Sequence, residues 1–249
     1  MRFAVIGDWG YPGTAVEDVV GEICDAGPFD FVLTTGDNFY LPDGRATEEN
    51  FFRPARCLTD SQVTWRAAWG NHDLGGTDTR DVLGAERRYA FSEGDARFVV
   101  LDGNTPDDLA QQGFLIDELA RGTRFSIVVV HQPVQTAGLK SAPRVNAAFD
   151  ATIKEGGAHL VLQGDNHFYE RIVQQGVTFV TSGGGGAPLT PCVRAVRGVM
   201  RCVARHHFLV VEVGSDAAQI EAVSRRGRVF DRAVILGGRA RRTVHGLGL

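Results

Sequence analysis

Residues 3–8 read Phe-Ala-Val-Ile-Gly-Asp, an apolar run that ends in a glycine and a carboxylate. Four later runs have a similar form, in which an apolar stretch, usually followed by a glycine, leads to a polar residue that can bind a metal. The later examples are 31–37 (FVLTTGD), 67–73 (AAWGNHD), 127–131 (IVVVH) and 160–167 (LVLQGDNH). Short apolar runs of this kind are typical of buried strands. Because ligands of open α/β sheets bind beyond the carboxyl ends of the strands, we expect five strand ends to direct oxygen and nitrogen donors into one crevice.

The segments around these runs alternate between strand and helix patterns and then, after residue 170, change to short strands alone. We expect helices at 15–26, 48–57, 107–121 and 144–154. We expect further strands at 97–101, 172–174, 178–181, 207–213, 219–223 and 229–231. This pattern fits an α/β fold with one mixed sheet, or with two sheets packed face to face and helices outside. We expect a single domain over residues 1–236 and a basic tail at 237–249.

The composition limits the classes of protein to which the chain can belong. It has 249 residues, of which 43% are hydrophobic, so it can build a core that needs no disulfide or structural metal to fold. A metal in this protein would therefore be functional. The net charge of −4 argues against binding to nucleic acid. No run approaches the length of about 18 uncharged apolar residues that a membrane span needs, so we expect no membrane partner.

The cysteines bear on the cellular compartment. Cys24, Cys57, Cys192 and Cys202 lack the Cys-x-x-Cys spacing of zinc or redox sites. Cys192 and Cys202 bracket a short basic stretch and would close a loop in an oxidising compartment, but free buried thiols are the plainer expectation. The chain starts directly at its first strand, which favours a cytoplasmic protein. Export followed by removal of a leader is the alternative.

The strand-end donors are carboxylates, an amide, imidazoles and the nearby phenol of Tyr40. A single aspartate in such a position is more often a turn former or a helix cap, but five donors in register favour a metal site. A mixed set of oxygen and nitrogen ligands without thiolate suits Fe, Mn, Zn or Mg, and this set is too large for one tetrahedral ion. Two metals about 3.5–4 Å apart would use these donors, and such pairs are typical of phosphoester hydrolysis.

Five ordered blocks of this sequence resemble those of the calcineurin-like metallophosphoesterases. The blocks are Gly7-Asp8, 36–40 (GDNFY), 70–73 (GNHD), Val130-His131 and 164–167 (GDNH). Most of that superfamily has a histidine where this chain has Gly10, and Tyr40 is the substitute ligand that marks the purple acid phosphatase and tartrate-resistant acid phosphatase branch. A glycine-rich stretch at 182–188, followed by 206–208 (HHF), is also similar to that branch. The ordered set is specific, although each short motif alone would be weak.

The resemblance implies a four-layer α/β/β/α sandwich, in which two mixed sheets are flanked by helices. It also implies two metals, with Asp8, Tyr40 and His167 on the first, Asn71 and His131 on the second, and Asp37 bridging both. The first ion would be iron, and the second would be iron, manganese, magnesium or zinc. His72 would lie near the leaving group as the catalytic proton donor, and Asn71 and His72 would contact the substrate.

Asp165 departs from the family pattern, which has a histidine at this position of the last block. Asp165 either ligates the second metal directly, because the spacing and the strand end are retained, or lies outside a site that has lost one ligand. Aspartate is shorter than histidine, so a direct bond needs a closer backbone or an intervening water. The substitution also makes the cluster one charge more negative, which should weaken its attraction for a phosphate dianion.

The residues and the resemblance together predict a metal-dependent phosphoesterase. A phosphomonoesterase that acts on a small phosphorylated substrate fits best, with a metal-activated hydroxide attacking phosphorus in line. A phosphodiesterase or nucleotide pyrophosphatase on the same scaffold is the alternative within this class. A non-catalytic relative that binds metal or phosphate is the alternative outside it, and the retention of His72 argues against that alternative.

Overall fold

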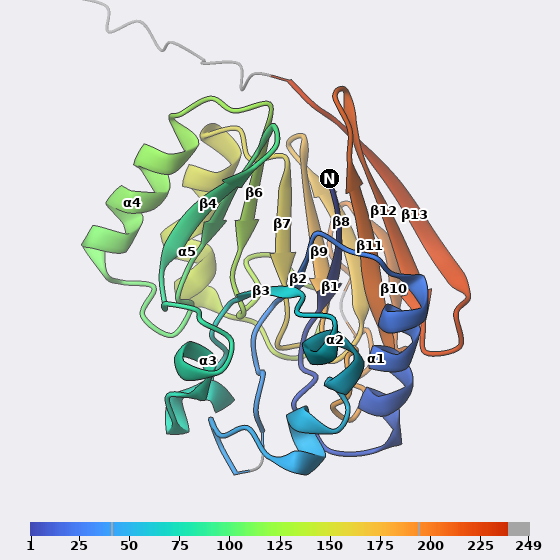
Figure 1. Ribbon diagram of the computed structural model, residues 1–249. Helices are drawn as coiled ribbons and strands as arrows, with labels where there is room; N and C mark the ends of the chain where they lie inside the picture. The colour runs from blue at the N-terminus through green and yellow to red at the C-terminus, as the bar shows by residue number, and fades with distance from the viewer. Residues whose placement is uncertain (41, 194, 239–249) are drawn as a thin grey trace, which may run out of the picture.

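The computed structural model describes residues 1–40, 42–193 and 195–238, which form two β-sheets packed face to face (Figure 1). One sheet has six strands in the order β13-β12-β11-β1-β2-β3: β1 (Arg2–Ile6), β2 (Phe31–Thr34), β3 (Thr64–Ala67), β11 (His207–Val213), β12 (Ala217–Ser224) and β13 (Val229–Leu236). The other has seven in the order β10-β8-β9-β7-β6-β5-β4: β4 (Tyr89–Glu93), β5 (Ala96–Val100), β6 (Phe125–Val129), β7 (Leu160–Gln163), β8 (Tyr169–Gln174), β9 (Val177–Ser182) and β10 (Val199–Val203).

Each sheet contains a block of neighbouring strands that run parallel, and in the six-stranded sheet this block ends at β1, which pairs antiparallel with β11. In the six-stranded sheet β1 pairs with β2, and β2 with β3, so that Val5 lies opposite Leu33 and Leu33 opposite Arg66. In the seven-stranded sheet β5, β6, β7 and β9 form the parallel part. Parallel neighbours end at the same edge of a sheet, so the polar residues that follow β1, β2, β6 and β7 emerge together.

The space between the sheets is filled by apolar side chains from both. Phe3 and Phe31 of one sheet stack with their ring centroids 4.7 Å apart, and Phe98 of the other sheet packs edge-on against both rings. Every residue of β2 is buried, which explains why its sequence has three consecutive apolar residues before Thr34 and no alternation with polar ones. Each aromatic or aliphatic side chain buried in this way stabilises the fold by about 1.5–3 kcal/mol.

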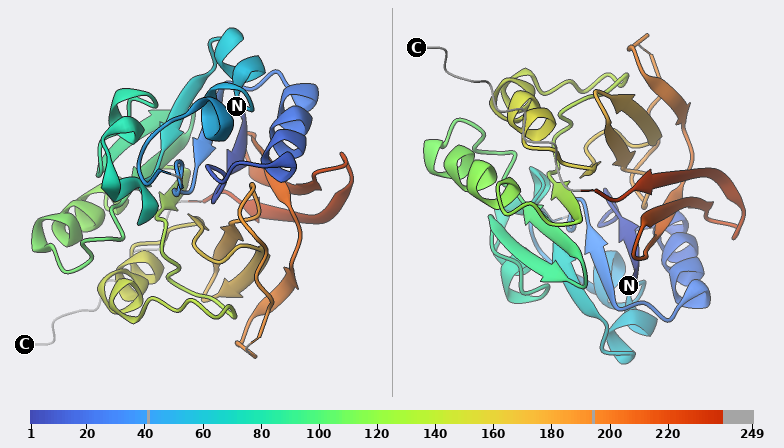
Figure 2. Two further views of the ribbon diagram at one scale, coloured as in Figure 1. Left: turned by 90° about the horizontal axis from the view of Figure 1, so that it is seen from below. Right: turned by 90° about the horizontal axis from the view of Figure 1, so that it is seen from above.

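Helices cover the outer faces of the two sheets (Figure 2). The helix α1 (Thr14–Ala26) packs on the six-stranded sheet, and α4 (Leu109–Leu119) and α5 (Pro143–Glu155) pack on the seven-stranded sheet. The buried side chains of α1 are Val16, Val19, Val20 and Ile23. Their spacing is that of one helical face, so the sequence pattern directly specifies which side of α1 is buried. The predicted four-layer α/β/β/α sandwich is confirmed.

The prediction of one continuous helix at 48–57 is wrong. A π-helical turn, η1 (Glu48–Phe52), is followed by a separate short helix, α2 (Arg56–Asp60). Pro54 lies between the two, and proline lacks the N–H that a continuous helix needs. Two other short helices, η2 (His72–Gly75) and α3 (Asp78–Asp81), and the strands β4 and β10 were not predicted. β4 and β10 are the edge strands of their sheet and lack a fully buried run.

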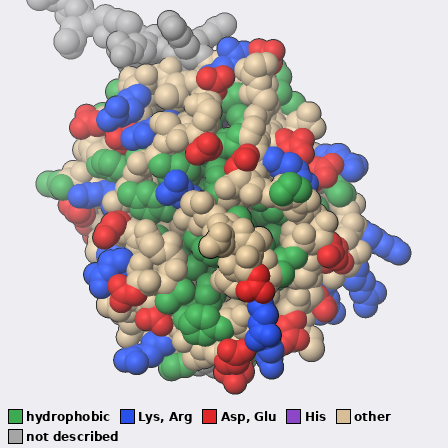
Figure 3. All heavy atoms as spheres, in the orientation of Figure 1, with side chains coloured by type: hydrophobic (Ala, Val, Ile, Leu, Met, Phe, Trp, Pro, Cys, Tyr) green, Lys and Arg blue, Asp and Glu red, His purple; other side chains and the backbone are tan. Residues whose placement is uncertain are grey.

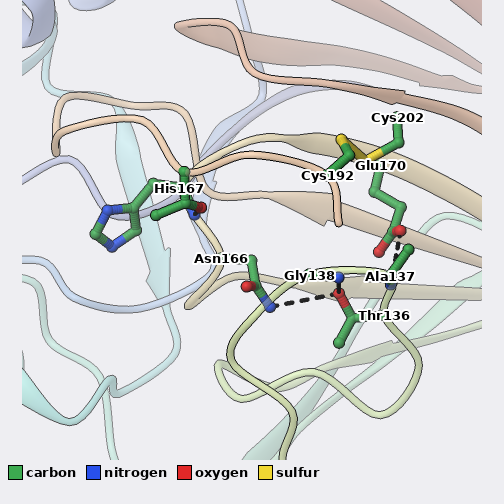
Figure 4. Close-up of a disulfide and its surroundings, with 9 residues drawn as sticks. Thr136, Ala137, Gly138, Asn166, His167, Glu170, Cys192 and Cys202 are labelled. Atoms are coloured by element: carbon green, nitrogen blue, oxygen red, sulfur yellow. Dashed lines mark hydrogen bonds between the residues drawn. A yellow bond between two sulfur atoms is a disulfide. The ribbon is translucent and has the colours of Figure 1, made fainter. Parts of the chain in front are cut away.

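The expectation of free thiols is also wrong. Cys24, near the end of α1, forms a disulfide with Cys57 in α2, and Cys192 forms one with Cys202 in β10 (Figure 4). No free cysteine remains among the residues that the structure describes. The first pair is 33 residues apart in sequence, so no local pattern indicated it.

The predicted tail at 237–249 lies mostly outside the described residues, which end at Gly238. The backbone N–H of Gly237 donates to the Asp216 carbonyl, and that of Gly238 donates to the Arg124 carbonyl. These two glycines therefore continue to pair with the body of the protein beyond β13. Within the described ranges, none of the helices combines the length and the apolar character that crossing a bilayer requires.

Candidate metal centre

Three predicted carboxylates follow strand ends in an uncommon backbone conformation. Asp8 after β1, Asp37 after β2 and Asp165 after β7 have φ angles of 54°, 52° and 65°. They are three of the five described residues other than glycine with positive φ. Such conformations cost about 1–3 kcal/mol each and cluster at functional sites. The glycines beside them allow close approach, since a Cβ on Gly70 would lie 2.1 Å from Asp37 Oδ1.

Asp8, Tyr40 and His167 form the first group of contacts. The Tyr40 hydroxyl donates to Asp8 Oδ1 at 3.0 Å and lies 3.1 Å from His167 Nε2. His167 Nδ1 lies 2.8 Å from the carbonyl of Pro188, which can only accept, so Nδ1 carries the proton and Nε2 faces the site. Burial, followed by the charges of Asp8 and Asp37, raises the pKa of Tyr40. A nearby cation would reverse this effect and favour the phenolate.

Asp37 and His131 form the second group, and both side chains are fully buried. His131 Nδ1 donates to the Thr35 carbonyl at 2.8 Å, so Nε2 points to Asp37 Oδ2, 3.3 Å away. Burial is the largest single influence on the pKa of His131 and would lower it, but the contact with Asp37 and the charges of Asp37, Asp8 and Asp165 together raise the pKa to about 10. Burial is likewise the largest influence on the pKa of Asp37 and would raise it, but His131 and His72 together outweigh burial and hold that pKa below its usual range.

The hydrogen bonding of Asp37 and His131 indicates whether a metal ion fits between them. Within the described part of the chain, Asp37 Oδ2 and His131 Nε2 are buried and lie 3.3 Å apart as an ion pair, but neither atom has a hydrogen-bond partner. Buried polar atoms of this kind are rare and costly. One ligand atom from each of Asp8, Asp37 and His131 also lies within 4.8 Å of the other two. A cation bound among these three residues would satisfy both unpartnered atoms, so the donor set fits a metal.

Asn71 and His72 lie beside this cluster. The backbone N–H of His72 donates to Asp37 Oδ1 at 2.9 Å, and the His72 ring lies over the Tyr40 ring with the centroids 4.3 Å apart. His72 Nδ1 lies 3.1 Å from the carboxylate of Asp43, a residue that the sequence analysis did not single out. Asn71 is exposed just before η2, and none of the contacts described above involves its side chain.

Asp165 lies at the site, where its backbone N–H donates to Asp8 Oδ2 at 3.0 Å. Its carboxylate forms an ion pair with Lys140, whose ammonium nitrogen is 2.9 Å from Asp165 Oδ1 and 3.5 Å from His167 Nε2. Lys140 belongs to the loop between β6 and α5, and no motif in that loop indicated a role for it.

Asp73 is a third residue for which sequence reasoning assigned no role. Its buried carboxylate accepts from the backbone N–H groups of Asn38, Phe39 and Gly70 and from the Asn38 side-chain amide, over distances of 2.7–3.1 Å. Burial raises the pKa of Asp73 to about 6. Asp73 therefore ties the loop that carries Asp37 and Tyr40 to the loop that carries Asn71 and His72. Its position in the block 70–73 was the available signal.

The sequence model of the calcineurin-like phosphoesterases matches residues 1–169, a span that includes every candidate ligand. The chain belongs to this family. Among its curated relatives, Purple acid phosphatase 17 of Arabidopsis thaliana is 25% identical over 236 residues, covering 74% of this chain and 68% of the relative. Purple acid phosphatase 7 of the same plant is 26% identical over 230 residues, covering 74% and 70%. These relatives place this phosphoesterase in the purple acid phosphatase-like branch.

Solved structures share the fold of this calcineurin-like phosphoesterase. The purple acid phosphatase PPD1 from yellow lupin (Lupinus luteus) seeds has a TM-score of 0.76 at 17% identity, covering 94% of this chain and 53% of that one. GAP50, the anchor in the inner membrane complex of Plasmodium, has a TM-score of 0.82 at 17% identity, covering 97% and 90%. At these identities the likeness shows the fold alone. Family membership and the Arabidopsis relatives identify the chain as a hydrolase.

Proposed function

We propose that this chain is a phosphomonoesterase with a dinuclear metal centre. Asp8, Tyr40 and His167 would hold the first ion, Asn71 and His131 the second, and Asp37 would bridge them, with Asp165 beside the second ion. The observation that carries the proposal is the buried ion pair of Asp37 Oδ2 and His131 Nε2, two atoms 3.3 Å apart that both lack a hydrogen-bond partner among the described residues.

The donor types limit which metals fit. A phenol, carboxylates and imidazoles suit iron in the site of Tyr40 and iron, manganese, magnesium or zinc in the second site. When bound, such a pair activates water for in-line attack on phosphorus and offsets the charge of the phosphoryl group. The chain itself supplies fixed ligands: Thr35 and Pro188 hold His131 and His167 with the Nε2 atoms facing the site.

His72 would give a proton to the leaving group. Its backbone N–H is held by Asp37 and its Nδ1 by Asp43, so Nε2 is the ring nitrogen that can reach a bound ester. The imidazole is 34% exposed, which leaves it open to a substrate. Asn71, exposed beside it, would contact the phosphoryl oxygens together with His72.

A small phosphorylated compound is the substrate that fits best. The net charge is −4, and positive and negative side chains are interspersed over the face in Figure 3. A protein that binds nucleic acid usually carries a continuous basic surface, so these features support a small substrate. The two disulfides support an oxidising compartment over the cytoplasm that the start of the sequence favoured.

A substrate panel tests this function. Protein reloaded with iron and a divalent metal is assayed with p-nitrophenyl phosphate, bis-p-nitrophenyl phosphate and a nucleotide. We expect the monoester to be hydrolysed fastest. Asp37→Asn should abolish turnover, whereas Asp81→Asn, a control substitution at an exposed aspartate, should retain it. Preference for the diester or the nucleotide would instead identify a phosphodiesterase or pyrophosphatase. Binding of phosphate without turnover under any metal combination would identify a non-catalytic relative.

A further inference from the structure

Lys140 is held in place at the edge of the candidate metal centre by a buried side chain. The carboxamide of Asn166, which is fully buried, accepts from the Lys140 backbone N–H at 3.1 Å and donates to the Lys140 carbonyl at 2.8 Å. Asn166 also lies against Thr136 and Gly138 (Figure 4). A Cβ on Gly138 would lie 2.3 Å from Asn166 Oδ1, so the loop needs glycine there. These contacts fix the backbone from which the Lys140 side chain extends.

The Lys140 ammonium lies among the candidate ligands. It is 2.9 Å from Asp165 Oδ1 and 3.5 Å from His167 Nε2, and the side chain is still 41% exposed. Only one other lysine, Lys154, occurs in the chain. Lys154 lies on α5, where it pairs with Asp150 at 2.7 Å. The chain thus offers one lysine–aspartate pair at the site and a matched pair away from it.

The positive charge of Lys140 offsets the negative charge that Asp165 adds to the cluster. An aspartate in place of a neutral histidine adds one negative charge to the cluster, whereas an Asp165–Lys140 pair adds none. An ammonium is also a strong donor to phosphate oxygens. We propose that Lys140 is a substrate-binding residue, which donates from its ammonium group to the phosphoryl group and restores the attraction that Asp165 alone would weaken. This inference rests on the proposed function.

Calorimetric titration of inorganic phosphate into metal-loaded protein tests the inference without using turnover. We expect Lys140→Met to bind phosphate about tenfold more weakly than the unaltered chain, a difference of about 1.4 kcal/mol. Lys140→Gln should behave similarly, and Lys140→Arg should recover most of the affinity. Lys154→Met, which removes the matched pair on α5, should bind phosphate like the unaltered chain. With p-nitrophenyl phosphate, Lys140→Met should raise KM more than it lowers kcat.

Three results would overturn the inference. Equal phosphate affinity in Lys140→Met and the unaltered chain would show that Lys140 does not contact phosphate, while turnover by the unaltered chain would leave the proposed function intact. A gain of one metal ion per chain in Lys140→Met would show that the ammonium occupies the place of a metal. Failure of the loaded, unaltered chain to bind phosphate and to hydrolyse any ester would remove the proposed function and the inference together.

Discussion

The two disulfides should contribute unequally to stability. Each bond removes conformational freedom from the unfolded chain, and the effect grows with the length of the loop that it closes. The Cys24–Cys57 bond spans 33 residues, which gives about 3.7 kcal/mol, and the Cys192–Cys202 bond spans 10, which gives about 2.7 kcal/mol. Cys24–Cys57 also joins α1 to α2, so its loss frees two elements that cover the six-stranded sheet.

Urea unfolding of the oxidised protein and of two double variants measures these contributions. We expect Cys24→Ala/Cys57→Ala to lose about 1 kcal/mol more of the unfolding free energy than Cys192→Ala/Cys202→Ala, which is the difference between the two loop terms. A thiol assay of the native, untreated protein is the control and should find no reactive thiol. Four titratable thiols in the native protein, or stability that neither double variant changes, would refute the reasoning.

Three further predictions concern a buried histidine, the orientation of His72 and the ligand Tyr40. Burial lowers the pKa of His207 from 6.5 to about 4. As the pH falls, the His207 imidazole is therefore protonated in the unfolded chain before it is protonated in the folded chain. The stability that this group contributes above pH 6.5 is lost between pH 6.5 and pH 4. From about pH 7 to about pH 5, protonation of His207 should lower the free energy of unfolding in urea by about 2 kcal/mol, at about 1.36 kcal/mol per pH unit. His207→Gln should lack this part of the loss. An identical pH profile in the variant would assign the loss of stability to other groups. Asp43→Ala should lower kcat by about fivefold, because an exposed ion pair such as Asp43–His72 is worth up to about 1 kcal/mol, and unchanged kcat would show that Asp43 does not orient the imidazole. Tyr40→Phe should remove the visible charge-transfer band of the iron-loaded protein, and a band of undiminished intensity would exclude the phenol as an iron ligand.

The parts of the fold that could be predicted depend on local patterns. β2 is buried on both faces and its apolar residues therefore follow one another without alternation, and α1 is amphipathic with a clear helical period. The edge strands β4 and β10 were missed because half-exposed strands can carry charged and polar residues. The helix predicted at 48–57 failed at Pro54, which overrides an otherwise suitable apolar spacing.

The candidate site shows the same division between local and distant information. Asp8 and Asp37 could be selected because each directly follows an apolar strand and a glycine. The role of Lys140 depends on contacts with Asn166, 26 residues away, and with Asp165, so nothing in its own loop marks it. The disulfide of Cys24 likewise depends on how two helices pack. Such pairings become visible only when the chain is folded.

The dinuclear metal centre is tested by the number of metal ions that each chain binds. Purified protein is reloaded with iron and a divalent metal, and excess ion is removed. The metal content per chain is then measured, and hydrolysis of p-nitrophenyl phosphate is assayed with and without a chelator. We expect two ions per chain, the loss of at least one ion in Asp37→Asn, and hydrolysis that disappears as the chelator removes the metal. One ion or fewer, together with undiminished hydrolysis in the chelator, would contradict this expectation.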